Sequence, residues 1–198
     1  SSIPLIAIPT TAGTGSELSK GAIISWPEMN IKSGIRGEAL LPSVALVDPL
    51  LTLTLPVVQV KITGFDCLAH AVETYISKLA NPLTSIFSAN AIKSVVKYLP
   101  IALNDLNDLE ARTQLSFNSM IMGYNLANSS TCLPHRLQYP LGTITKTAHA
   151  LGLAVLYPNW LKITNSFSRN KFTNVANWFA GGLSLPGNNS NNDIIDLF

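Results

Sequence analysis

Apolar residues follow two different patterns along the chain, and the pattern changes near residue 56. Before that point, short apolar runs at 5–8, 22–25 and 44–47 alternate with Gly, Pro and Ser, as is typical of strands and turns. From Val57 onward the spacing of apolar residues predicts helices over about 57–77, 84–99, 109–126, 147–163 and 169–180. We expect Asn81-Pro82 to close the segment after the first helix and Pro100 to end the second. The Asn-rich stretch 187–193 predicts a loop.

This layout predicts the fold class. We expect an α/β N-terminal remnant followed by an all-α helical bundle domain, so that the chain is predominantly helical. The boundary between the two falls near Leu55-Pro56, where the period of the pattern changes.

Composition narrows the class of protein. The 198 residues include 47% hydrophobic and only 12% charged residues, about half the usual share of ~25%, so we expect some faces to be covered by another subunit. A net charge of +2 without a basic run argues against a nucleic-acid partner. The most apolar stretch, 40–60, is interrupted by three prolines and Asp48, so we expect no membrane span. Two cysteines, Cys67 and Cys132, are too few for a disulfide scaffold and favour a reducing compartment, the cytoplasm.

The three histidines of the chain suggest a metal site. Asp66 and His70 are four residues apart in a predicted helix, so their side chains share one face. His135 and His149 would have to come from other elements to complete a set of three imidazoles and one carboxylate. Such a set suits Fe(II), Zn(II), Co(II) or Ni(II) and leaves a position for a substrate oxygen. An exposed ion pair on a helix, or a histidine whose hydrogen bonds are satisfied without a metal, is the competing interpretation and the more frequent one for Asp-x-x-x-His alone.

A glycine turn rich in hydroxyl groups follows the first apolar run. In the stretch 8–17, Thr10, Thr11 and Thr14 surround two glycines, and such a turn can bind phosphate or ribose oxygens. The turn matches neither a G-x-G-x-x-G motif nor a Walker loop, and a plain helix start capped by Ser16 explains it equally well. Lys32 could meet a cofactor phosphate or ribose, although a solvated lysine is the more frequent case.

Taken together, these residues resemble the iron-containing (group III) alcohol dehydrogenases. The stretch 4–17 is similar to the Pro-Thr-Thr-Ala-Gly-Thr-Gly-Ser-Glu signature of that family, and 41–56 is similar to its domain-linking segment. The stretch 63–73 is similar to its first metal-ligand helix. His135 and His149, with Gly142 between them, fall where the family has its third and fourth ligands.

The resemblance implies an NAD(P)-dependent oxidoreductase acting on a small alcohol or aldehyde. Residues 1–56 would be the C-terminal part of a dinucleotide-binding α/β domain, and 57–198 a truncated helical metal-binding domain. The protein would be a homo-oligomer, such as a dimer. The implied ligands of Fe(II) or Zn(II) are Asp66, His70, His135 and His149, and the residues lining NAD or NADP are Thr10, Thr11, Thr14, Lys32 and Thr52.

Departures from the family pattern leave alternatives open. Tyr139 stands where family members often have a histidine near the nicotinamide, which makes it a candidate catalytic residue and puts the substrate in doubt. The same architecture could act on a hydroxyacid and an oxoacid, or on a phosphonate aldehyde. The upstream glycine-rich diphosphate loop of the family has no equivalent here, so we expect an internal segment, which could be a catalytically silent metal-binding fragment by itself.

Overall fold

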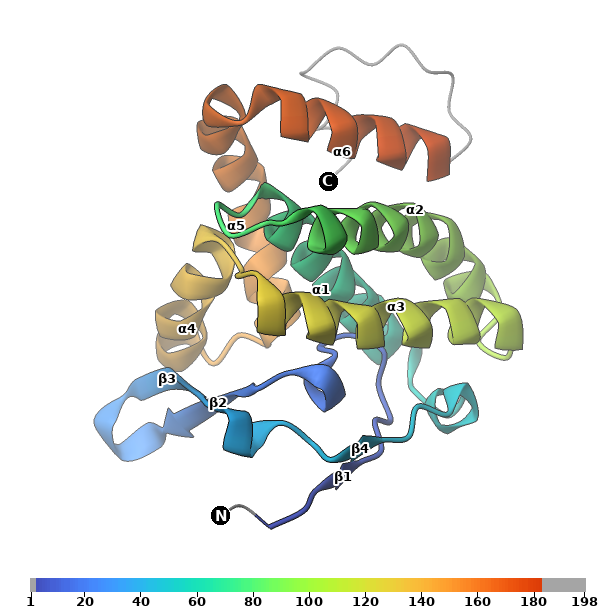
Figure 1. Cartoon of the computed structure of the whole chain (residues 1–198), viewed down its shortest axis with the longest axis vertical. Helices are drawn as coiled ribbons and strands as arrows, with labels where there is room; N and C mark the ends of the chain where they lie inside the picture. The colour runs from blue at the N-terminus through green and yellow to red at the C-terminus, as the bar shows by residue number, and fades with distance from the viewer. Residues whose placement is uncertain (1–2, 183–198) are drawn as a thin grey trace.

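Helices make up most of the chain and lie to one side of a small strand-containing layer. The computed structural model describes residues 3–182, so the loop expected at 187–193 lies outside the described part. Figure 1 shows the helices together, with the strands on the side of the N-terminus. The helices are α1 (Val57–Ile76), α2 (Pro82–Asn104), α3 (Leu109–Asn128), α4 (Leu133–Thr145), α5 (His149–Thr164) and α6 (Arg169–Gly182). The predicted fold class is confirmed, whereas the division into two domains at residue 56 stays a prediction.

The strands form two separate pairs. Strand β1 (Ile6–Ala7) pairs in parallel with β4 (Val44–Ala45), and β2 (Gly21–Trp26) pairs antiparallel with β3 (Ile31–Arg36). The three apolar runs expected to be strands overlap β1, β2 and β4. Sequence reasoning missed β3, because its alternation is interrupted by Ser33 and Gly34.

Helix α1 lies at the centre of the helical body. Every residue from Asp66 to Ser77 is buried, so this half of the helix is covered on all sides. It packs against α2, α3 and α5. Side chains of Asp66 and His70 are therefore held inside the protein rather than on a solvated face. This burial removes the solvated ion pair that competed with the metal interpretation.

Two expectations about proline near α2 were wrong. The dipeptide Asn81-Pro82 begins this helix instead of closing a segment. The Asn81 side chain accepts from the Thr84 backbone N–H at 3.0 Å, and Thr84 Oγ1 accepts from the Asn81 N–H at 2.9 Å, so each caps the other. Proline is well suited to the first helical position because its missing N–H has no partner there anyway.

Pro100 does not end α2, which continues to Asn104. A proline removes one backbone hydrogen bond from a helix and crowds the preceding turn. Here only one turn follows it, and that turn places Ala102 fully inside the core. The turn also closes with the Asp105 N–H donating to the Ile101 carbonyl. We attribute the continuation of the helix to this burial.

Helix α4 was not predicted as a helix. Pro134, Pro140 and Gly142 all argue against one when the sequence is taken locally. Pro134 falls in the first turn, where proline is tolerated. The helix buries His135 and Gln138 on one side, and this side faces α5 and α1.

Within the described residues, α2 is the one helix that is long and apolar enough to cross a membrane by length and composition. Core helices of soluble proteins often pass the same test. In this structure α2 packs against α1, α3 and α6. The expectation of no membrane partner therefore stays a prediction.

Candidate metal centre and adjoining pocket

Three helices bring the four predicted ligands together. Asp66 and His70 lie one turn apart on α1, as their spacing predicts. His135 lies in the first turn of α4, and His149 is the first residue of α5. A short turn that includes Lys146, in the left-handed conformation at φ 58°, reverses the chain between these two helices.

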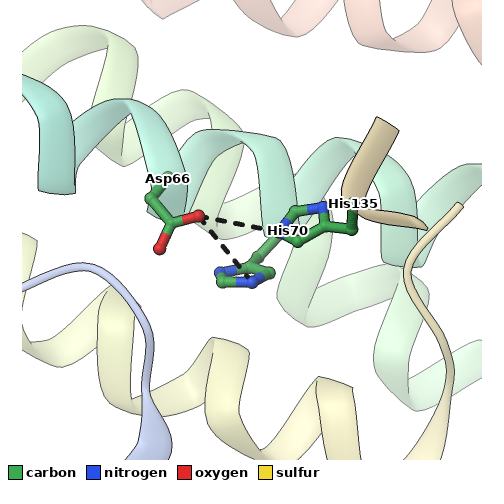
Figure 2. A group of neighbouring side chains, drawn as sticks. All are labelled: Asp66, His70 and His135. Atoms are coloured by element: carbon green, nitrogen blue, oxygen red, sulfur yellow. Dashed lines mark ion pairs between the residues drawn. The ribbon is translucent and has the colours of Figure 1, made fainter. Parts of the chain in front are cut away.

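One nitrogen of each of the three imidazoles lies within 4 Å of the same carboxylate oxygen. Oδ1 of Asp66 lies 3.9 Å from Nε2 of His70, 3.6 Å from Nε2 of His135 and 3.5 Å from Nε2 of His149. One donor atom from each of Asp66, His70 and His135 falls within 4.8 Å of the others. Figure 2 shows, as dashed lines, the two contacts between the carboxylate of Asp66 and the rings of His70 and His135.

These distances suit a shared metal ion better than hydrogen bonds. They exceed the usual hydrogen-bond length of about 2.7–3.2 Å. Two ligands each about 2.1 Å from a tetrahedral ion would be about 3.4 Å apart. Among the described residues, neither Asp66 Oδ1 nor His135 Nε2 has a hydrogen-bond partner, although both atoms are buried. The residues present therefore fit a divalent transition metal.

Nδ1 of two of the imidazoles also lies within hydrogen-bond distance of a side-chain oxygen. Nδ1 of His135 lies 2.7 Å from Oε1 of Glu73, a fully buried carboxylate on α1. Glu73 also accepts hydrogen bonds from the Cys132 backbone N–H at 2.6 Å and from the Tyr157 hydroxyl at 3.2 Å. Nδ1 of His149 lies 2.6 Å from Oε1 of Gln138. Acceptors on Nδ1 leave Nε2 of each ring available for a metal.

Burial and charge set the protonation of the site. Burial lowers the pKa of His70 to about 4, despite the opposing charge of Asp66. Burial would raise the pKa of Asp66, but the imidazoles, His70 foremost, hold it well below its usual range. Burial alone would lower the pKa of His135, yet Glu73 and Asp66 together raise it to about 9. An ionised Asp66 and a neutral His70 are the forms that bind metals, whereas His135 would release a proton when a metal binds.

A pocket of about 570 Å³ opens beside the four predicted ligands. Its walls are α4, the β2–β3 hairpin and the glycine turn. The strand-containing segment before residue 56 and the helices after it therefore meet at this pocket. Its lining residues are Thr14, Ser16, Ser19, Gly21, Ala22, Ile23, Lys32, Gly34, Ile35, Arg36, Asp66, His70, Leu126, Thr131, His135, Arg136, Tyr139 and His149.

The structure brings only some of the predicted cofactor and catalytic residues to this pocket. Thr14, Lys32 and Tyr139 line it, whereas Thr10 and Thr11 are exposed outside it. Thr52 is buried away from the pocket, and its hydroxyl donates to the Pro49 carbonyl at 2.8 Å. Cofactor roles for all five residues, and a catalytic role for Tyr139, stay predictions.

The two glycines of the turn, Gly13 and Gly15, pack closely against α1 and α3. A Cβ on Gly13 would lie 2.8 Å from Cβ of Thr63 on α1, and one on Gly15 would lie 2.4 Å from the backbone nitrogen of Gly123 on α3. Gly15, at φ 61°, is also the residue that caps the short helix Ser16–Leu18, the place expected for Ser16. The glycines thus dock the turn onto two helices.

Sequence reasoning did not single out Gln138, Arg36 or Arg136. Gln138 is a polar residue three positions after a predicted ligand, and that spacing on a helix could have indicated its proximity to the site. Arg36 belongs to the strand that was missed. No local signal places Arg36 beside residues a hundred positions later in the chain.

The fold and the donor set define a class of protein: a helical domain in which one Asp and three His lie close enough to bind a metal, beside a strand-containing segment and a pocket. Residues 60–197 match the C-terminal model of the Fe-containing alcohol dehydrogenase family, and residues 1–49 match the iron-containing alcohol dehydrogenase model. The chain belongs to the iron-containing alcohol dehydrogenase family of oxidoreductases, and the predicted resemblance is confirmed.

Relatives within the family differ in what their names describe. The mitochondrial hydroxyacid-oxoacid transhydrogenase of Mus musculus is 36% identical over 78% of this chain and 37% of its own length. The NAD-dependent methanol dehydrogenase of Bacillus methanolicus is 33% identical over 88% of this chain and 46% of its own length. A crystal structure of 1,3-propanediol oxidoreductase superposes with a TM-score of 0.87 and 31% identity, covering 98% of this chain and 50% of that one. This chain therefore spans half or less of each of these proteins.

Proposed function

We propose that the chain is the metal-binding part of an NAD(P)-dependent oxidoreductase that interconverts an alcohol and an aldehyde or ketone. The observation that carries the proposal is the convergence of Asp66 with three imidazoles on the wall of a pocket. The donor set suits Fe(II) or Zn(II). When bound, the metal would polarise the substrate oxygen while NAD or NADP exchanges a hydride with the adjoining carbon.

Glu73, which is buried behind the site, and three side chains that line the pocket have separate proposed roles. Glu73 accepts a hydrogen bond from Nδ1 of His135, and this contact keeps Nε2 of the His135 ring directed at Asp66. Thr14 and Lys32 present a hydroxyl and an ammonium group, which suit cofactor oxygens. Tyr139 presents a phenol that can donate a hydrogen bond to a substrate oxygen. Of the five predicted cofactor residues, Thr14 and Lys32 are the two that the pocket favours.

Turnover of the full-length protein tests this proposal. The metal is removed with a chelator, Fe(II) or Zn(II) is added back, and oxidation of NADH or NADPH is followed with a small aldehyde. Asp66→Asn should abolish the metal-restored activity, whereas Asp105→Asn, an exposed Asp after α2, should retain it. A metal-free preparation that stays inactive after both metals are added would contradict the proposal.

The charge of the pocket favours a second candidate function. Lys32, Arg36 and Arg136 line the pocket, and among the described lining residues the only carboxylate belongs to Asp66, a proposed metal ligand. Such a surface attracts an anionic group, as a hydroxyacid, an oxoacid or a phosphonate aldehyde carries. The name of the mouse relative includes a hydroxyacid and an oxoacid.

A substrate panel separates the two candidates. We compare a primary alcohol with the hydroxyacid of the same carbon length, in the native enzyme and in Arg136→Met. Loss of a charged hydrogen bond worth about 1.5–3 kcal/mol should raise KM for the hydroxyacid roughly 10- to 150-fold and leave the alcohol unaffected. Arg169→Met, which changes an exposed arginine at the start of α6, is the matched control. Equal effects on both substrates would exclude anion recognition by Arg136.

A third candidate is that the chain alone is a metal-binding module without catalytic activity. The motivation is that it spans less than half of the curated relatives described above. Calorimetry of the purified chain with NADH tests this, since micromolar binding would contradict it. A homo-oligomeric state and a cytoplasmic location stay predictions.

A further inference from the structure

Gln138 occupies a particular position behind one of the proposed metal ligands. It is fully buried on α4, and its Oε1 lies 2.6 Å from Nδ1 of His149. On the other side of the same ring, Nε2 of His149 lies 3.5 Å from Oδ1 of Asp66. An imidazole that binds a metal through Nε2 carries its proton on Nδ1 and needs an acceptor there. The Gln138 oxygen is that acceptor.

Two glycines make room for the Gln138 side chain. A Cβ on Gly142, one turn further along α4, would lie 2.7 Å from Nε2 of Gln138. A Cβ on Gly152, in α5, would lie 3.1 Å from Cγ of Gln138. Neither position accepts a side chain unless Gln138 moves. The crossing of α4 and α5 is therefore fitted to this one amide.

The amide is a poor choice for packing alone. Nε2 of Gln138 is buried and has no hydrogen-bond partner among the described residues. Leaving such a donor unpaired is unfavourable, and an apolar side chain of similar length, such as Met, would fill the same space without that donor. What an apolar side chain could not supply is the oxygen that faces His149.

We propose that Gln138 is a positioning residue for His149. Its Oε1 holds the proton on Nδ1 and fixes the plane of the ring, so that Nε2 faces the metal position. The proposal rests on the metal site proposed above. The Nδ1 atoms of the two imidazoles from α4 and α5 then have different acceptors: the Glu73 carboxylate for His135 and the Gln138 amide oxygen for His149.

The test separates the role in the site from packing. Gln138→Met keeps the volume and removes the acceptor, and Gln138→Glu keeps an acceptor. Nitrogen-15 NMR of the metal-free protein reports which nitrogen of His149 carries the proton. Cobalt(II) titration reports metal affinity and, through the visible spectrum, the geometry of the ligands. Thermal melting reports packing.

We expect Gln138→Met to lose the fixed Nδ1–H form and to bind Co(II) about 10- to 100-fold more weakly, with an altered spectrum. Its melting temperature should be equal to or above that of the native protein, because the unpaired donor is gone. Gln138→Glu should retain the Nδ1–H form and native-like affinity. Gln114→Met, on α3 and outside the pocket lining, should change neither NMR nor Co(II) binding.

A second variant, Gly142→Ala, displaces the Gln138 side chain without changing Gln138 itself. Gly142→Ala should displace the amide and weaken Co(II) binding, but should add little in the Gln138→Met background, since both act through one contact. Gly181→Ala is its control, because no atom of the described residues lies within 4 Å of a Cβ there. Native tautomer and affinity in Gln138→Met, or full additivity with Gly142→Ala, would overturn the proposal. If the native protein bound no Co(II), the proposed metal function would fail, while the tautomer measurement would still decide the role of Gln138.

Discussion

The contact between Gly15 and Gly123 offers a sharp steric test of how the glycine turn is held. A Cβ added to Gly123 would lie 1.8 Å from the carbonyl oxygen of Gly15 and 2.8 Å from its carbonyl carbon. Both are backbone atoms, so no side chain can rotate away to relieve the overlap. Gly123→Ala must therefore push the turn that carries Thr14 away from α3.

The size of the effect follows from two opposing terms. Ordinary contact between such atoms requires about 3.4 Å or more, so the turn must move by more than an ångström. Overpacking in a fixed environment costs about 1–3 kcal/mol, and a backbone clash this close belongs at the upper end. Alanine gains about 1 kcal/mol over glycine inside a helix. The net loss of about 2 kcal/mol corresponds to a melting temperature lower by about 4–8 °C for a chain of this size.

Two assays separate the turn from the metal site. Thermal melting should show the loss of stability, and steady-state kinetics of the full-length enzyme should show a higher KM for NADH. Cobalt(II) affinity should stay unchanged, because none of the four proposed ligands lies on α3 or on the turn. Gly181→Ala is again the matched control. A Gly123→Ala variant with native melting temperature and native KM would refute the steric reasoning.

Three further changes test the charges of the site and its surroundings. Glu73→Gln should lower the melting temperature by about 2–12 °C, because Cys132 N–H, His135 Nδ1–H and a tyrosine hydroxyl share its two oxygens and an unpaired buried donor costs about 1–3 kcal/mol; an unchanged melting curve would contradict this. Burial raises the pKa of Glu17, so the folded state loses stability as this carboxyl ionises with rising pH. Glu17→Gln should therefore raise the melting temperature at pH 7, with a gain that shrinks towards pH 4; an equal gain at both pH values would rule out this cause. Zinc(II) at a hundred times its dissociation constant should raise the melting temperature by about 5–11 °C, equivalent to about 2.7 kcal/mol, and His70→Ala or a chelator should abolish the gain.

The sequence predicts the fold well where helical periodicity dominates and poorly where proline intervenes. The ranges expected for α1 and α3 agree closely with the structure, because their apolar spacing is regular. Helix α4 was missed, and Pro82 and Pro100 were misjudged. The local cost of a proline can be estimated from sequence, but the burial that offsets it depends on which helices pack together. Ala102 and Gln138, both fully buried, are residues whose burial no local pattern indicates.

Some features of the candidate site depend on residues close in sequence, and others depend on contacts between residues far apart in the chain. The spacing of Asp66 and His70 is a local property of one helix, so sequence alone could place them on one face. The groups that orient the ligands act over distance, since Glu73 and His135 are 62 positions apart. The glycine turn reaches α3 across more than a hundred positions, through Gly15 and Gly123. Donor type is therefore encoded locally and donor orientation by packing, so changes to Glu73 or Gln138 should alter how tightly a metal is held without altering which atoms hold it.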